Sequence, residues 1–224
     1  MIELLVGMAM GMVVMVGLTV MIITVLHGTA RVDARVEATD NARLVVARVT
    51  EELHSACISP QIAPIRTGSN GTELIFWHAA AGEAAAVAPI PVKSKIAYNS
   101  STRTLTQTDY KRTGGESPYW TFEGEGENHG TGSARILLTN VAPMSPSTSV
   151  FAYEKYGNGA LKLATTPLSE TEAAETITVN VALTASPKSS PVADKGSAAT
   201  VKDSATLRLT PPSFESSASA LPCQ

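Results

Sequence analysis

The chain has 224 residues, enough for one sizeable domain with an appendage, and it carries a formal net charge of −3 with an isoelectric point near 5.8. Because there is no basic excess, the composition offers no electrostatic basis for binding nucleic acid. The only cysteines are Cys57 and Cys223, and neither lies in a CxxC motif or near a pair of histidines, so the sequence contains no recognisable zinc site.

The first 26 residues are almost entirely apolar, with Glu3 as their only charged side chain. Residues 4–26 are rich in Met, Leu, Val and Ile and contain no proline. As a helix they would extend roughly 34 Å, which crosses the ~30 Å hydrocarbon core of a bilayer. A cleaved signal peptide is the alternative, but its apolar region would be only ~7–15 residues long and would follow basic residues. The segment therefore predicts a transmembrane helix.

The helical pattern continues past the apolar run. Residues 29–58 contain no proline or glycine, and Pro60 is the first residue that would stop a helix. Apolar side chains recur at steps of mostly three and four, as on one face of a helix: Val32, Val36, Ala42, Val45, Val49, Leu53 and Ala56. We expect one helix from about residue 2 to about residue 55, with any break near Gly17. Its amphipathic half should lie on the β-rich remainder of the chain.

The opposite face of this amphipathic half is charged. The pairs at a spacing of four are Arg31–Arg35 and Asp33–Glu37, which are like-charged, and Arg48–Glu52, which is of opposite sign. Like charges at this spacing destabilise a helix slightly and opposite charges stabilise it slightly.

Glu3 is the unusual residue of the apolar run. A carboxylate in lipid is expensive and usually marks a functional site, although Glu3 is also close enough to the chain end to reach interfacial water. Gly7 and Gly11 form a small-xxx-small pair, which lets two helices approach closely, although glycine is also common in membrane helices generally.

Residues 58–224 read as short strands separated by turns. The expected strands are 73–78, 92–98, 104–110, 134–139, 150–156, 160–164, 176–184 and 205–210. Turn residues at 68–71, 99–102 and 157–159 separate some of them. Residues 186–203 and 211–222 are rich in Ser, Pro and Ala, and we expect both to be exposed loop or tail.

No motif of a hydrolase, nucleotide-binding or metalloprotease site is present, so the chain is not expected to be an enzyme or to hold a cofactor or metal. The histidines are scattered and are expected at the surface or at boundaries: His27, His54, His78 and His129. The acidic residues Glu123, Glu125 and Glu127 suggest a solvated loop, with a calcium site as the alternative. Trp77 and Trp120 are expected to be core or half-buried anchors. Alternatively, Trp120 could form a contact patch with Tyr119 and Phe122.

Residues 2–6, Ile-Glu-Leu-Leu-Val, followed by a Met/Val/Gly-rich span, resemble the mature start of type IV pilins and type II secretion pseudopilins. The resemblance implies an α+β pilin fold, in which a long transmembrane-amphipathic helix packs on an antiparallel β-sheet domain. It also implies that Glu3 pairs with the N-terminal amine of a neighbouring subunit, with Gly7, Gly11 and Gly17 in the assembling helix. In the family this glutamate is the fifth mature residue and follows a basic leader. Either these residues precede the present sequence or its processing differs.

The order of the later strands is similar to that of the large minor pilins of the W type and the pseudopilins of the J type. On this basis residues 1–27 are the membrane and filament-core half of the helix and residues 28–57 its amphipathic half. Residues 58–224 are the β-rich globular domain.

The resemblance implies a structural subunit of an extracellular type IV pilus or related pseudopilus. Its partners are then other pilin subunits, in a homo- or hetero-filament, and the membrane before assembly. It would be a single-pass protein of the cytoplasmic (inner) membrane before assembly and part of a cell-surface filament afterwards. The alternative is a single-pass membrane-anchored adhesin or receptor with a β-rich ectodomain.

Cys57 closes the long helix and Cys223 is the penultimate residue, after a tail with little apolar content. We predict that these two cysteines form a disulfide. The resemblance offers a parallel, since many pilins close a C-terminal region with a disulfide, but there both cysteines usually lie late in the chain. Two unpaired thiols are the alternative.

Overall fold

The computed structural model describes residues 2–57, 63–79, 91–115, 119–124, 132–157, 159–187 and 198–207, and its first element is one long helix. Helix α1 (Ile2–His54) has 53 residues and does not break at Gly17. The predicted helix is therefore confirmed. Its length follows from the absence of proline, and its C-terminal half is stabilised by packing on the strands that follow.

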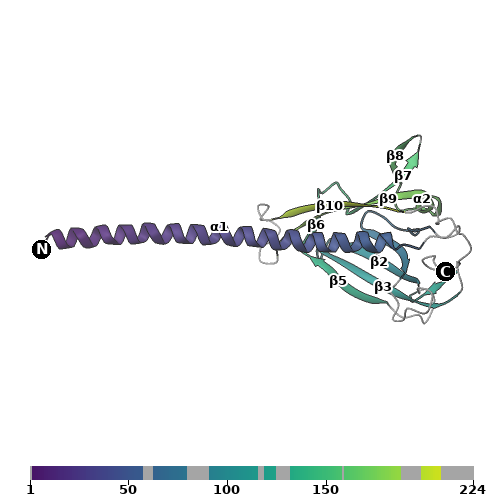
Figure 1. The fold of residues 1–224 in the computed structure, drawn as a ribbon, viewed down its shortest axis with the longest axis horizontal. Helices are drawn as coiled ribbons and strands as arrows, with labels where there is room; N and C mark the ends of the chain where they lie inside the picture. The colour runs from purple at the N-terminus through teal and green to yellow at the C-terminus, as the bar shows by residue number, and fades with distance from the viewer. Residues whose placement is uncertain are drawn as a thin grey trace, which may run out of the picture.

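The strands form two antiparallel sheets on either side of the C-terminal part of α1 (Figure 1). In the first sheet, β1 (Glu73–Ala79), β2 (Pro91–Asn99) and β3 (Thr104–Gly114) pair in this order, and β3 also pairs with β4 (Thr121–Phe122) and β5 (Ser133–Thr139). In the second sheet, β10 (Ala199–Thr206), β9 (Thr176–Ala185), β7 (Phe151–Gly157) and β8 (Ala160–Leu163) are neighbours in this order. Strand β6 (Val141–Pro143) pairs with β9, and the short helix α2 (Glu170–Glu175) precedes β9.

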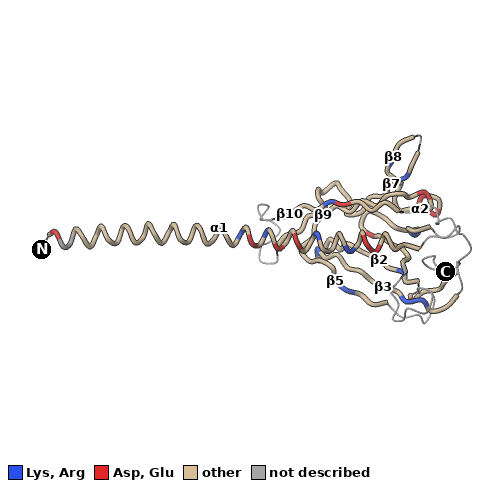
Figure 2. The backbone as a smooth tube through the Cα atoms, viewed as in Figure 1, with Lys and Arg blue, Asp and Glu red and all other residues tan. Residues whose placement is uncertain are grey.

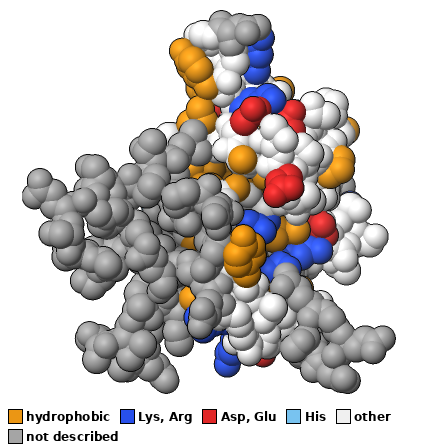
Figure 3. Space-filling model, turned by 90° about the vertical axis from the view of Figure 1, so that its right-hand side faces the viewer, with side chains coloured by type: hydrophobic (Ala, Val, Ile, Leu, Met, Phe, Trp, Pro, Cys, Tyr) orange, Lys and Arg blue, Asp and Glu red, His pale blue; other side chains and the backbone are white. Residues whose placement is uncertain are grey.

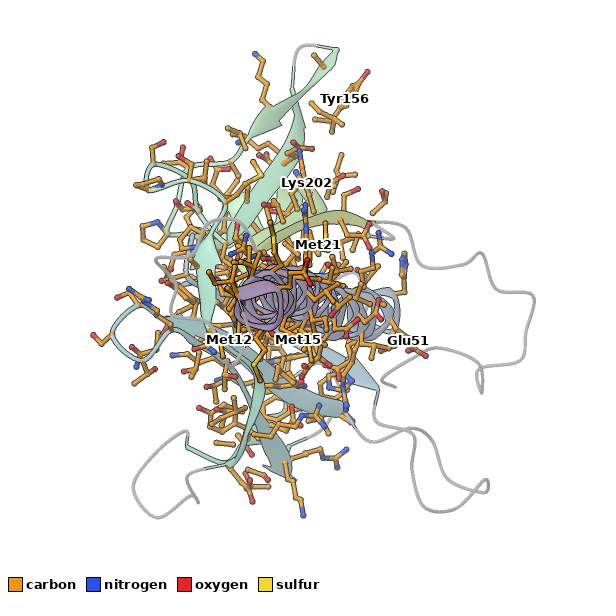
Figure 4. All side chains as sticks on the ribbon, turned by 90° about the vertical axis from the view of Figure 1, so that its left-hand side faces the viewer. Met12, Met15, Met21, Glu51, Tyr156 and Lys202 are labelled. Carbon is orange, nitrogen blue, oxygen red and sulfur yellow. The ribbon has the colours of Figure 1, made fainter. Side chains whose placement is uncertain are left out.

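The main core lies where α1 meets both sheets. Helix α1 contributes a buried stripe at steps of three and four, formed by Ala38, Ala42, Val46, Val49 and Leu53. Buried side chains of both sheets complete this core, among them Leu74, Phe76, Ile96, Leu105, Val179, Val181 and Leu183. Seen along the helix axis, α1 lies between the two sheets (Figure 4). The chain is thus an α+β protein with a projecting N-terminal helix.

A second, smaller core cluster lies beyond the end of α1. It contains Cys57, Trp77, Trp120 and Phe122, with the half-buried Tyr110 against it. The rings of Trp77 and Phe122 are 4.9 Å apart, and the Arg66 guanidinium lies 3.9 Å from the centre of the Trp77 ring. The expectation that both tryptophans are core anchors is confirmed, and only the neighbouring Tyr119 is exposed.

Seven of the eight predicted strands match β1, β2, β3, β5, β7, β8 and β9 closely. The eighth prediction, 205–210, is shifted, because β10 is Ala199–Thr206 and residues 208–210 lie outside the described part. The expected loop 186–203 is correspondingly wrong from residue 199 onward. Ala199 and Ala205 are buried where α1 packs along β10, so small residues that look like low-complexity sequence allow a helix and a strand to approach closely. The short elements β4, β6 and α2 were not predicted.

Helix α2 did have a sequence signal. The Ser169 hydroxyl accepts a hydrogen bond from the Glu172 amide at 3.2 Å, in the Ser-x-x-Glu pattern of a helix N-terminus. Lys155 of β7 then holds α2 through its ammonium group, which donates to Glu172 at 3.0 Å and to Glu175 at 2.9 Å. These two carboxylates raise the pKa of Lys155, with Glu175 having the larger effect.

Candidate functional site

The N-terminal part of α1 projects from the globular domain and is apolar on all sides. An 18-residue window within it reaches a mean hydropathy of 2.5, and none of that window is buried. The first half-buried side chain of α1 is Ala34, so residues 2–33 extend about 48 Å beyond the domain. Met12, Met15 and Met21 surround the helix when it is viewed end-on (Figure 4). This part of α1 is therefore apolar all round and is not buried by its own chain, and it is long and apolar enough to span a membrane.

Two polar side chains within the apolar run are satisfied by the helix itself. The hydroxyl of Thr19 donates to the Met15 carbonyl at 2.8 Å, and that of Thr24 donates to the Val20 carbonyl at 2.8 Å. Neither hydroxyl then needs a water molecule as a partner. This arrangement suits a hydrocarbon environment, where an unsatisfied polar group costs several kcal/mol.

Glu3 lies in the first turn of α1 and is exposed. A carboxylate at this position interacts favourably with the exposed amides and positive dipole end of the helix N-terminus. Figure 2 shows a long segment without charge between the acidic position near the N-terminus and the charged part of α1 near the domain. No ion pair joins Glu3 to another described residue, so any charged partner would have to come from outside this part of the chain.

The glycines of the apolar run make room for no other side chain or segment among the described residues. A Cβ atom built at Gly7, Gly11 or Gly17 meets no other atom within 4 Å. Gly7 and Gly11 are four residues apart and share one face, whereas Gly17 points about 100° away from the direction midway between them. A glycine in a helix interior costs about 1 kcal/mol relative to alanine, and no contact of the described residues offsets that cost.

Exposed apolar side chains continue on α1 past the length that a bilayer would cover. Val32 and Val36 are 61% and 53% exposed, although the sequence pattern predicted that they would lie on the domain. The correction follows from the position of the domain, whose buried contacts with α1 begin only at Ala38. Leu44 is 70% exposed on the face opposite the buried stripe. These three side chains are more than half exposed, and they lie beyond a membrane formed around residues 4–26.

A polar cluster fixes the C-terminal end of α1 on the first sheet. The Gln107 side-chain amide donates to Glu52 Oε2 at 2.7 Å and to Asp109 Oδ1 at 2.8 Å, and its carbonyl accepts from Arg135 Nη2 at 2.7 Å. Arg135 Nη2 also lies 3.2 Å from Glu52 Oε1, and Arg48 pairs with Glu52 at 3.1 Å. Gln107 is buried, so these hydrogen bonds hold its side chain in one orientation between the helix and the first sheet. Of these residues, only the Arg48–Glu52 pair was recognisable in the sequence.

The same cluster brings a serine, a histidine and an aspartate together, but not as a catalytic triad. The Ser94 hydroxyl donates to Asp109 Oδ1 at 2.6 Å, and His78 Nε2 lies 3.0 Å from the same hydroxyl. In a triad the histidine lies between the serine and the carboxylate and removes the serine proton. Here the serine lies in the middle and its hydroxyl donates a hydrogen bond to the carboxylate. Ser94 is also fully buried. The arrangement connects side chains of β1, β2 and β3 and does not have the geometry of a catalytic triad.

The remaining candidate residues are placed as follows. Glu123 Oε2 accepts a hydrogen bond from the Lys111 amide at 3.2 Å, and Glu125, Glu127 and His129 lie outside the described residues. Within the described part of the chain, no group of three His, Cys, Asp or Glu side chains could hold a metal ion. His27 and His54 are exposed on α1, as expected.

Cys57 is buried and disulfide-bonded. Cys223, the other cysteine of the sequence, lies outside the described residues, so its pairing with Cys57 stays a prediction.

The outer face of the second sheet carries a groove of about 410 Å³. Its lining includes the segment after β6 and the start of the projecting β7–β8 hairpin, with Met144, Glu154, Leu163, Asn180 and Lys202 among the contributing residues. The hairpin also exposes Tyr156 and Leu161, and Figure 3 shows hydrophobic side chains on one edge of this projection. This surface was not predicted from the sequence, because the residues that form it are separated along the chain.

Comparison with known proteins identifies no relative. No protein-family model matches the sequence, and neither the curated proteins nor the solved structures include a significant match.

Proposed function

We propose that this chain is a structural subunit of a type IV pilus or a related pseudopilus. Residues 1–27 anchor the subunit in the cytoplasmic (inner) membrane before assembly. Packing of the N-terminal helices of many subunits then builds a filament on the cell surface. The globular domain, with a pilin-type fold, is carried on the outside of that filament. Its neighbours are copies of this chain or other pilin subunits.

The observation that carries the proposal is the exposed apolar surface of α1 outside the membrane-length segment. A membrane anchor alone accounts for the apolar residues of the first 26 positions. It does not account for Val32, Val36 and Leu44, which are 53–70% exposed to water in the isolated chain. In a bundle of parallel helices these side chains would be covered by neighbouring copies, and Gly7 and Gly11 would allow the helices to approach closely.

The experiment compares Leu44→Asp with Ile136→Asp in cells that make the full chain. Both residues are exposed apolar side chains, at 70% and 62%, but Leu44 lies on α1 and Ile136 on β5. We expect both variants to reach the membrane fraction normally. Leu44→Asp should be largely lost from the sheared, high-molecular-mass filament fraction, because a charge would be buried between helices. Ile136→Asp should remain in that fraction. Equal amounts of both variants in the filament fraction would refute the role of α1 in assembly.

A second candidate is a membrane-anchored adhesin or receptor that remains unassembled. The groove on the second sheet and the exposed side chains Tyr156, Leu161 and Leu163 favour it, because such surfaces are typical of binding sites. In this case no sheared fraction would contain the wild-type chain. Substitutions in the hairpin, and not in α1, would then abolish function.

A further inference from the structure

The segment of α1 between the apolar run and the domain has an unusual distribution of charge. This segment, residues 27–37, is termed the stalk. Arg31, Asp33, Arg35 and Glu37 of the stalk are all exposed. None of them forms an ion pair with another described residue. Figure 2 shows both signs of charge in this part of the helix, where it leaves the domain.

Helix geometry separates the two signs onto opposite flanks. Successive residues of a helix are rotated by 100° about its axis. Seen along the axis, Val32 and Val36 together point in one direction. Arg31 and Arg35 together point about 100° to one side of it. Asp33 and Glu37 lie about 100° to the other side. The stalk therefore presents an apolar row of two valines, with a basic flank on one side and an acidic flank on the other.

This arrangement is unfavourable for the isolated chain. Arg31 repels Arg35 and Asp33 repels Glu37, because residues four apart are neighbours on a helix surface. If one of the two arginines and one of the two acidic residues changed places, each pair would contain opposite charges and both pairs would be attractive. No compensating interaction comes from the described residues of the same chain, so a partner for these charges has to be sought outside them.

We propose that the stalks of two copies of this chain pack in parallel, with Val32 and Val36 in the seam and the basic flank of each copy against the acidic flank of the other. This inference rests on the proposed assembly of the chain and names the contact that orients it. Two parallel helices that face each other across their valine rows are related by a rotation of 180° about an axis parallel to both. This rotation places the basic flank of each copy next to the acidic flank of the other. Antiparallel packing would bring like flanks together. The charges thus select the parallel arrangement, as e and g positions do in coiled coils.

The lipid surface is the competing partner for the basic flank. Arg31 and Arg35 follow the apolar run closely enough to contact anionic headgroups. Headgroups would leave the acidic flank unpaired and would leave Val32 and Val36 in water. A second copy accounts for both flanks and for the valines, which is why the observations favour it.

The experiment uses the full chain with Val32→Cys, reconstituted in uncharged phosphatidylcholine vesicles, and measures the yield of cross-linked dimer after oxidation. Cys57 is buried and already disulfide-bonded, so it does not compete. Two charge reversals are compared in this background: Arg31→Glu with Arg35→Glu, and Asp33→Lys with Glu37→Lys. The matched control is Arg31→Lys with Arg35→Lys, which keeps the charge. Thermal unfolding of the globular domain in each variant confirms that the domain is intact.

Each reversal alone should lower the dimer yield about fivefold, because every flank contact becomes repulsive. An equimolar mixture of the two reversed chains should restore the yield as heterodimer, and the lysine control should cross-link like the parent. High salt should weaken the parent dimer by screening.

An unchanged yield in both reversals, with strong cross-linking of the parent, would overturn the flank pairing and leave the proposed assembly standing. No cross-linking of the parent at all would count against both. If only the arginine reversal lowered the yield, and only in vesicles with anionic lipid, the basic flank would bind headgroups and the pairing would be wrong.

Discussion

Gln107 and Glu52 are 55 positions apart in the sequence and are joined by a 2.7 Å hydrogen bond from the amide to the carboxylate. This bond connects the helix that projects from the molecule to the sheet that forms part of its body. With Asp109 and Arg135, Gln107 fixes how far α1 is rotated and translated on the first sheet. The faces that α1 presents outside the domain are therefore fixed relative to the strands.

Replacing Gln107 by Leu should destabilise the domain by about 2–3 kcal/mol, because a buried side chain loses its hydrogen bonds to the carboxylates of Glu52 and Asp109 and to Arg135. Urea unfolding of the full chain in mild detergent would measure the effect. Lys95→Ala is the control, since Lys95 and Glu73 form a 2.7 Å ion pair whose side chains are about one-third exposed. That change should alter the free energy of unfolding by less than about 1 kcal/mol. Equal effects of the two substitutions would show that the Gln107 cluster is no more important than a surface pair.

Replacing Glu3 by Ala should leave membrane insertion at least as efficient as in the wild type, because removal of a charge lowers the cost of transfer into lipid. The same change should strongly reduce incorporation into filaments, because in the proposed assembly the N-terminal amine of a neighbouring subunit would lose its carboxylate partner. Carbonate extraction of membranes measures insertion, and the sheared fraction measures assembly. Incorporation of the variant at the wild-type level would rule out the assigned role of Glu3.

Tyr153 should make the domain sensitive to alkaline pH. Its hydroxyl donates to the carbonyls of Glu73 at 2.8 Å and Asn70 at 3.1 Å, and burial raises the pKa of this phenol well above its ordinary value of 10. Above about pH 10 the unfolded chain loses this proton while the folded chain keeps it. The free energy of unfolding should then fall by up to about 1.4 kcal/mol per pH unit.

Tyr153→Phe is the matched variant for this prediction. It should lose about 1–2 kcal/mol at pH 7, where both hydrogen bonds of the hydroxyl are missing. Between pH 10 and pH 11 its stability should fall less steeply than that of the wild type. Parallel pH profiles of the two proteins in denaturant titrations would contradict the prediction.

The predicted bond between Cys57 and Cys223 would close a loop of 166 positions. In the chain-entropy view such a loop contributes about 5 kcal/mol to stability, which reduction should remove. Alkylation of the denatured, unreduced chain followed by mass spectrometry is the direct check, and no alkylated cysteine should be found. Two alkylated cysteines would refute the bond. A dimer that dissociates on reduction would show that the bond joins two chains.

The long helix and most of the strands were predictable because they depend on local patterns. An apolar run without proline determines α1, and alternation of apolar and polar residues determines strands such as β9. The position of β10 was not predictable from its small residues, because the burial of an alanine can be inferred only when the element that packs on it is known. The start of the domain on α1 was also misjudged, since Val32 and Val36 follow the helical period of the buried stripe without being covered.

The features of the candidate site also include some that the sequence predicts and others that depend on the tertiary structure. The sequence by itself determined the membrane-length helix, the position of Glu3 and the like-charged pairs of the stalk, because each depends only on residues close together in the chain. The tertiary structure alone decided that the Glu52 carboxylate meets Gln107, that Ser94 lies between His78 and Asp109, and that the valines of the stalk stay exposed. These outcomes depend on contacts between residues far apart in the chain, which are set by how two sheets close around one end of a helix.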